Sequence, residues 1–156
     1  MTQQSINTAV SQLKKAFENG GPREALVFLN SLTTQRFSSL YRFDGDMLRN
    51  ITFYDRESPD LEECEEIPIL ASYCVFVRDS GKRFATTEAA CDERVQGHPK
   101  QKTVQSYCGV PLLDRSGKMF GTICHFDFKP SSVSHFDIEL MEHMAKLLET
   151  HNETAN

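Results

Sequence analysis

The sequence of 156 residues, with 39 % hydrophobic and 25 % charged residues, has the composition of a globular protein. A chain of this length buries about 68–70 % of its unfolded surface, so one complete hydrophobic core needs no disulfide or metal support. The net charge of −5, without a long basic tract, argues against nucleic acid as a partner. No apolar run approaches the ~18 residues of a membrane span, so no membrane embedding is expected.

The start of the chain and its cysteines indicate a cytoplasmic location. Residues Met1 to Ser5 lack the basic and apolar regions of a secretory signal. The five cysteines are odd in number and include no Cys-x-x-Cys pair, which favours free thiols in a reducing compartment. His125 follows Cys124 on a predicted strand, so their side chains point to opposite faces and do not share a metal. We assign neither a metal nor a cofactor.

Two helices are predicted at the N-terminus. Ile6, Val10, Leu13 and Phe17 recur at helical spacing, which places them on one face of a helix within residues 1–20. The Gly20-Gly21-Pro22 sequence ends this helix. Pro22 suits the first position of a second helix, where its missing N–H is not needed, and this helix is expected to end near residue 33.

From Arg36 the hydrophobic period changes to two, which predicts a strand. Phe37, Ser39, Tyr41 and Phe43 share one face and give that face an aromatic character. Asp44-Gly45 supplies a tight turn, and residues 47–54 form the return strand of a hairpin.

The middle of the chain reads as loops around short elements. Residues 55–66 carry seven acidic side chains and are interpreted as a solvated loop. Pro68 is expected to open a helix that closes at Gly81, and residues 83–87 form a short strand. Residues 88–104 are an irregular crossing with a helical turn near residues 92–94.

A second hairpin and a last helix complete the predicted plan. Residues 104–113 and 118–128 are strands joined by the four-residue loop 114–117. Ser134 and Asp137 have the spacing of a capping box, which precedes an apolar stripe of Ile138, Met141, Ala145 and Leu148. This order of elements predicts an α+β fold with one antiparallel sheet whose two faces receive different elements.

The segment from Tyr107 to Pro130 carries a series of motifs: Tyr107-Cys-Gly-Val-Pro-Leu-Leu-Asp114, Ser116-Gly117, Phe120-Gly-Thr-Ile-Cys124, Phe126-Asp127 and Lys129-Pro130. Together they resemble the C-terminal half of a GAF domain. The resemblance implies a single GAF-like domain over residues 1–156, with a core of about 23–150 after the helix of residues 1–20. It also implies a sheet of five or six antiparallel strands, with terminal helices on one face and loops and short helices on the other.

Members of this family commonly hold a small molecule between the sheet and the loops. The resemblance therefore implies a sensor or regulatory domain that binds a small-molecule ligand and signals through its terminal helices. The signatures of cyclic-nucleotide-binding and bilin-binding members are absent, so the ligand stays unassigned. The candidate pocket residues are Tyr41, Phe43, Phe53, Tyr73, Phe76, Tyr107 and Phe126, and the alternative for each is ordinary core packing.

Two further hypotheses follow from the family. One enzymatic branch reduces free methionine sulfoxide with cysteine thiolates, and for this alternative the candidate residues are Cys74, Cys91 and Cys108. Many members pair through their terminal helices. The apolar stripes of the two terminal helices therefore predict a homodimer, against the alternative that both stripes pack within one chain.

Overall fold

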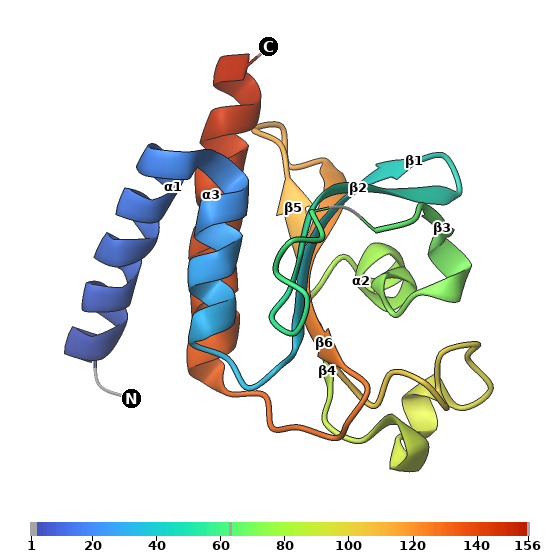
Figure 1. Ribbon diagram of the computed structural model, residues 1–156. Coiled ribbons are helices and arrows are strands. Elements are labelled where there is room, and N and C mark those ends of the chain that lie inside the picture. The colour runs from blue at the N-terminus through green and yellow to red at the C-terminus, as the bar shows by residue number, and fades with distance from the viewer. Residues whose placement is uncertain (1–2, 63, 156) are drawn as a thin grey trace.

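A six-stranded antiparallel sheet forms the centre of the protein, whose computed structural model describes residues 3–62 and 64–155 (Figure 1). Its order is β3-β2-β1-β6-β5-β4, so two local hairpins meet through the pairing of β1 with β6. The strands are β1 (Phe37–Asp44), β2 (Met47–Asp55), β3 (Ile67–Pro68), β4 (Phe84–Thr86), β5 (Ser106–Leu113) and β6 (Met119–Asp127).

Different elements cover the two faces of the sheet, as the sequence predicts. Helices α1 (Gln3–Ser31) and α3 (His135–Ala155) lie side by side on one face (Figure 1). The other face receives α2 (Cys74–Ser80), three short 3-10 turns and the connecting loops. The predicted GAF-like α+β architecture is thus confirmed, and the sheet has the larger of the two expected strand numbers.

The break predicted in the N-terminal helix lies at Gly21. Its φ of 74° and ψ of −160° are not helical, and they divide α1 into two rods. Such a φ favours glycine, and Pro22 then starts the second rod, where its fixed φ is pre-organised for a helix. The second rod runs back along α3 to Ser31 and leads into β1 (Figure 1).

Alternation along the strands creates two separate cores. Leu40, Cys108 and Ile123 point to the helices, whereas their neighbours Tyr41, Tyr107 and Cys124 point to the loops. The helix-side core is Ile6, Ala9, Leu13, Ala25, Leu26, Leu29, Leu40, Cys108, Val110, Leu112, Ile123, Leu140, Met141, Met144 and Leu148. The loop-side core is Tyr41, Leu48, Ile69, Tyr73, Cys74, Val75, Val77, Ala89, Val95, Val104, Tyr107 and Cys124.

Two glycines allow close approach inside the strands. A Cβ at Gly121 would overlap the carbonyl group of Tyr41 on the neighbouring strand. A Cβ at Gly109 would overlap the ring and hydroxyl of Tyr107, which folds over this position. Both glycines therefore have the role expected of glycine in a strand, which is to leave room for another group.

Two sequence interpretations are wrong in detail. Asp55 is not part of a solvated loop: it ends β2, is 4 % exposed, and accepts two hydrogen bonds from Arg36, from Nε at 2.8 Å and from the terminal nitrogen at 2.9 Å. Pro68 does not open a helix, because Ile67 and Pro68 instead pair with Leu48 and Met47 as β3. The helix α2 begins only at Cys74, although it ends at the predicted Gly81 with a left-handed φ of 71°.

The predicted turn at Gly117 and the predicted capping box at Ser134 are confirmed. Gly117 turns the β5–β6 hairpin with a φ of 86°. At the start of α3, the Asp137 N–H donates to Ser134 Oγ at 3.1 Å, and the Ser134 N–H donates to the Asp137 carboxylate at 3.4 Å. This is the reciprocal arrangement of a capping box.

Candidate functional site

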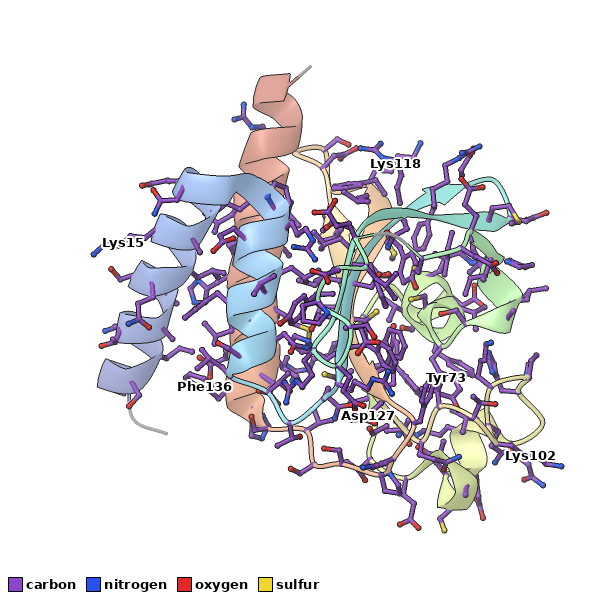
Figure 2. The ribbon with its side chains drawn as sticks, viewed as in Figure 1. Lys15, Tyr73, Lys102, Lys118, Asp127 and Phe136 are labelled. Atoms are coloured by element: carbon purple, nitrogen blue, oxygen red, sulfur yellow. The ribbon has the colours of Figure 1, made fainter. Side chains whose placement is uncertain are left out.

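A pocket of about 370 Å³ lies between the sheet and the loop layer. Strands β1, β2, β5 and β6 supply its floor, and the segments before α2 and before β5 supply its walls. Figure 2 shows Tyr73 on this side of the sheet, opposite the helix layer that carries Phe136. The lining residues are Phe37, Tyr41, Phe53, Cys64, Glu65, Ile67, Ala71, Ser72, Tyr73, Lys100, Thr103, Val104, Tyr107, Cys124, Phe126 and Phe128.

Most of the aromatic residues predicted from the sequence surround this pocket. They are Tyr41, Phe53, Tyr73, Tyr107 and Phe126. The other two lie elsewhere: Phe43 packs, partly buried, against the loop-side core, and Phe76 stacks on Phe84 with ring centroids 4.7 Å apart.

Two further rings, Phe37 and Phe128, line the pocket but are not among the seven candidate pocket residues. The ring of Phe37 stacks on that of Phe126, with ring centroids 4.8 Å apart. The rings of Phe37 and Phe128 are in an edge arrangement, with ring centroids 4.9 Å apart. The signal for Phe37 was present, because it shares the face of Tyr41 at even spacing. Phe128 lies one residue beyond the end of β6, although the predicted strand of residues 118–128 already places it on the face of Phe126.

The tyrosine hydroxyls in the pocket are engaged within the protein. The Tyr73 hydroxyl donates to the Val104 carbonyl at 2.9 Å, and the Tyr107 hydroxyl donates to Cys74 Sγ at 3.2 Å. The Tyr41 hydroxyl lies 3.5 Å from Cys64 Sγ. Burial raises the pKa of Tyr73 to about 12 and the pKa of Tyr41 and Tyr107 well above the ordinary value. All three phenols are therefore neutral near physiological pH.

Two of the lining residues carry a charge, the partly exposed Lys100 and the exposed Glu65. Within residues 3–62 and 64–155, neither residue forms an ion pair. The deeper lining is aromatic and aliphatic or carries hydroxyl and thiol groups. The pocket thus combines apolar walls with charge near solvent, an arrangement suited to an apolar body with one polar end.

The structure does not bring together the three cysteines of the reductase hypothesis. Cys74 is buried in the loop-side core, Cys108 is buried on the helix side of the sheet, and Cys91 is exposed in a 3-10 turn. Burial raises the pKa of Cys108 to about 12, and the Glu88 carboxylate raises the pKa of Cys91. Neither is an activated nucleophile in this structure.

The cysteines that do face the pocket are Cys64 and Cys124, with Cys74 in contact beneath. Alternation excludes Cys108 from this set, because it is the neighbour of Tyr107 on one strand and points to the opposite face, but alternation does not place Cys64 or Cys74, which lie outside the strands. The same rule separates Cys124 from His125, which is buried and lies 2.6 Å from Ser38 Oγ through Nδ1.

No cluster of His, Cys, Asp or Glu suited to a metal ion occurs in the part of the chain that the structure describes. Among the same residues, no helix has the length and apolar character that crossing a membrane requires.

Comparison with known proteins relates this architecture to one family. The sequence profile of the GAF domain matches residues 13–151. An alignment of 93 positions, which covers 55 % of this chain and 15 % of the relative, gives 27 % identity to a cyclic di-GMP phosphodiesterase of Pseudomonas aeruginosa. The chain therefore corresponds to a small part of this relative.

Two solved structures show the same fold. The GAF domain of the Acinetobacter phosphoenolpyruvate-protein phosphotransferase aligns with a TM-score of 0.73 and 12 % identity, over 99 % of this chain and 98 % of that one. The free methionine-R-sulfoxide reductase of Neisseria meningitidis, solved with its substrate, aligns with a TM-score of 0.70 and 17 % identity, over 95 % and 86 % of the two chains. At these identities the likeness concerns the fold.

Proposed function

Because the chain belongs to the GAF domain family, we propose that it is a non-enzymatic sensor or regulatory domain that binds a small molecule in the aromatic pocket. The observation that carries this proposal is the cavity of about 370 Å³ between the sheet and the loop layer. Its size and its apolar lining are typical of small-molecule sites. The phosphodiesterase relative supports no catalytic assignment, because the match covers only 15 % of that enzyme.

The ligand class follows from the distribution of polar groups. The hydroxyls of Tyr73 and Tyr107 are already hydrogen-bonded within the protein, so the floor offers mainly ring surfaces. Lys100 and Glu65 are the charged lining residues. A molecule with a flat apolar body and a charged or polar end directed toward solvent fits this arrangement.

The signal is proposed to leave through α1 and α3. Pocket residues Tyr41, Tyr107 and Cys124 alternate along their strands with Leu40, Cys108 and Ile123, which pack beneath the helices. A ligand that shifts the pocket side of these strands also acts on the helix side, because packed cores respond by discrete rearrangement.

A homodimer through the terminal helices is also part of the proposal, with a narrower contact surface than the sequence predicts. Residues such as Leu13 and Met141 are buried within one chain and do not face a second copy. The helix residues left partly exposed include Val10, Phe17 and Leu147, and these would form the contact. Light scattering at micromolar concentration tests this, and a mass near 17.7 kDa would contradict the dimer.

The pocket is tested with anilinonaphthalene sulfonate, a fluorescent probe that has an apolar body and one anionic group. Ala71 lines the pocket, so Ala71→Phe fills it and is expected to reduce probe binding at least tenfold. Leu70→Phe is the matched control, because Leu70 is adjacent, 67 % exposed and outside the lining. Equal probe binding by both variants would remove the pocket from the proposal. Native mass spectrometry of the purified protein then identifies a retained ligand.

The reductase alternative has support from the shared fold with the Neisseria enzyme, but its three predicted cysteines lie apart. It is tested by thioredoxin-coupled NADPH oxidation with free methionine sulfoxide. Activity that Cys74→Ser abolishes would overturn the non-enzymatic assignment.

A further inference from the structure

Two buried cysteines, Cys74 and Cys124, lie against each other beneath the pocket. Cys74 begins α2, and Cys124 lies within β6. Cys74 Sγ is 3.2 Å from Thr122 Oγ1, and Thr122 shares the strand face of Cys124 because the two are separated by one residue. Cys74 and Cys124 both belong to the loop-side core, and each sulfur affects the pKa of the other. Both side chains are nearly inaccessible, at 0 % and 1 % exposure.

The polar groups around this pair favour one sulfur as a thiolate. Burial acts to raise the pKa of Cys74, but the neighbouring thiol and hydroxyl groups of Cys124, Ser72, Thr122 and Tyr107 outweigh burial and lower this pKa below its ordinary value. The pKa of Cys124 lies well above its ordinary value. The larger cause is its interaction with Cys74, and the second cause is burial. The two sulfurs therefore differ in the way that a nucleophilic and a resolving cysteine differ.

The pocket offers small oxidants a route as far as Cys124 and the groups that cover Cys74. Cys124 is itself a lining residue, and so are Ser72 and Tyr107, which both contact Cys74. Cys108 has no such route, since it is packed beneath the helices on the other face. Cys91 is exposed but has a carboxylate as its partner, with Glu88 Oε1 at 3.5 Å from its sulfur.

We propose that Cys74 and Cys124 form a peroxide-sensitive pair that closes to a disulfide between α2 and β6. In the first step the Cys74 thiolate attacks one oxygen of hydrogen peroxide, which breaks the O–O bond, forms a sulfenic acid and releases hydroxide. In the second step Cys124 gives its proton to hydroxide and its sulfur attacks the sulfenic sulfur, which releases a second hydroxide. With the proton that Cys74 loses beforehand, two thiols and one peroxide give one disulfide and two waters.

Formation of the disulfide is expected to change the pocket, because the Tyr107 side chain in the pocket floor loses a hydrogen-bond acceptor. The Tyr107 hydroxyl donates to Cys74 Sγ at 3.2 Å in the reduced protein. A neutral disulfide sulfur is a much weaker acceptor than a thiolate, so the Tyr107 hydroxyl loses its strong acceptor, and the Tyr107 ring, which lines the pocket, is expected to shift. Disulfide formation itself does not depend on any ligand, so its test stands apart from the proposed sensor function.

The experiment treats the folded wild-type protein with a small excess of hydrogen peroxide, blocks remaining thiols, and maps disulfides by non-reducing peptide mass spectrometry. The expected result is one linked peptide pair joining Cys74 to Cys124, which a dithiol reductant reverses. Since the measurement uses the wild-type chain, it does not depend on a variant that folds poorly. The proposal is overturned if both cysteines remain thiols under conditions that oxidise the exposed Cys91, or if the pair forms only in denaturant.

Variants identify the roles of the two sulfurs. In Cys124→Ser, Cys74 is expected to accumulate as a sulfenic acid that dimedone traps, whereas Cys74→Ser leaves Cys124 unreacted. Cys91→Ser and Cys108→Ser are the controls and keep the disulfide. Probe binding by the oxidised protein, compared before and after reduction, is expected to change by at least threefold and to recover. Binding identical in both states would show that closure leaves the pocket unaltered and would overturn the coupling through Tyr107.

Discussion

The two faces of the sheet use the same strands for different purposes. On the helix side, Leu40, Val110 and Ile123 pack against aliphatic residues of α1 and α3 in the larger of the two cores. On the loop side, aromatic rings and thiols line a cavity of about 370 Å³. Alternation lets one strand serve both faces, so the helix-side core and the lining of the proposed pocket come from neighbouring residues. The helix side is expected to respond to lost volume, and the loop side to tolerate added volume.

The sharpest test of this difference changes one residue on each face. Leu26→Ala on the helix side removes a fully buried side chain and is expected to cost roughly 2–5 kcal/mol of unfolding free energy. Ala71→Phe fills the pocket on the loop side and is expected to change stability by less than about 1 kcal/mol. Urea unfolding measures both. Similar losses for the two variants would end the distinction between the faces.

A pair of glycines tests whether the faces can be disturbed separately. Gly121→Ala forces a Cβ against the Tyr41 backbone, so two strands must separate, at an expected cost of roughly 3 kcal/mol. Gly109→Ala instead displaces the Tyr107 ring and is expected to cost less, about 1–2 kcal/mol, while it impairs probe binding more strongly. Thermal unfolding ranks the two variants by stability, and probe titration ranks them by probe binding. A Gly109→Ala variant less stable than Gly121→Ala would contradict the close approach at Gly121.

The ion pair between Arg36 and Asp55 at the end of β2 makes part of the stability depend on pH. Hydrogen bonds from Arg36 hold the pKa of Asp55 below its ordinary value. Its stabilisation is therefore complete above the unfolded pKa, about 3.9, and is lost as the pH falls through the lower folded pKa. Asp55→Asn is expected to cost about 1–3 kcal/mol near pH 7, with a difference from wild type that shrinks in acid. A difference that stays constant down to acid unfolding would contradict this role.

The smallest expected effect concerns the start of α3. Ser134→Ala removes the side-chain oxygen that accepts from the Asp137 N–H, at a cost of about 1 kcal/mol. Ser132→Ala is a matched control in the preceding loop, since within residues 3–62 and 64–155 Ser132 accepts hydrogen bonds only through its backbone carbonyl. Guanidinium unfolding measures the loss of unfolding free energy. The Ser134→Ala substitution is expected to leave probe binding unaltered.

Local signals were sufficient for the architecture. The period of two along Phe37–Asp44, the glycines of the turns and the Ser134 capping box are each set by a few adjacent residues, and the structure contains all of them. Where a distant partner decides the outcome, sequence reasoning failed. Asp55 is buried because Arg36 reaches it, and Ile67 forms a strand because Leu48 pairs with it.

The pocket was predictable to the extent that alternation places its residues. Tyr41, Tyr107 and Phe126 follow from strand faces, but Lys100 and Cys64 come from irregular segments whose path no periodic pattern defines. The contact between Cys74 and Cys124 depends on how α2 docks on β6, which neither element encodes alone.

The pairing of β1 with β6 also determines when the pocket can exist during folding. Phe37 pairs with Phe126 across most of the chain, whereas each hairpin closes over a short turn. Because loop-closure entropy disfavours such a distant contact, we expect the two hairpins to form before β1 pairs with β6. Tyr41 belongs to one hairpin and Tyr107 and Cys124 to the other. The complete cavity is therefore expected only after β1 has paired with β6. Before that step each hairpin carries only part of the pocket lining.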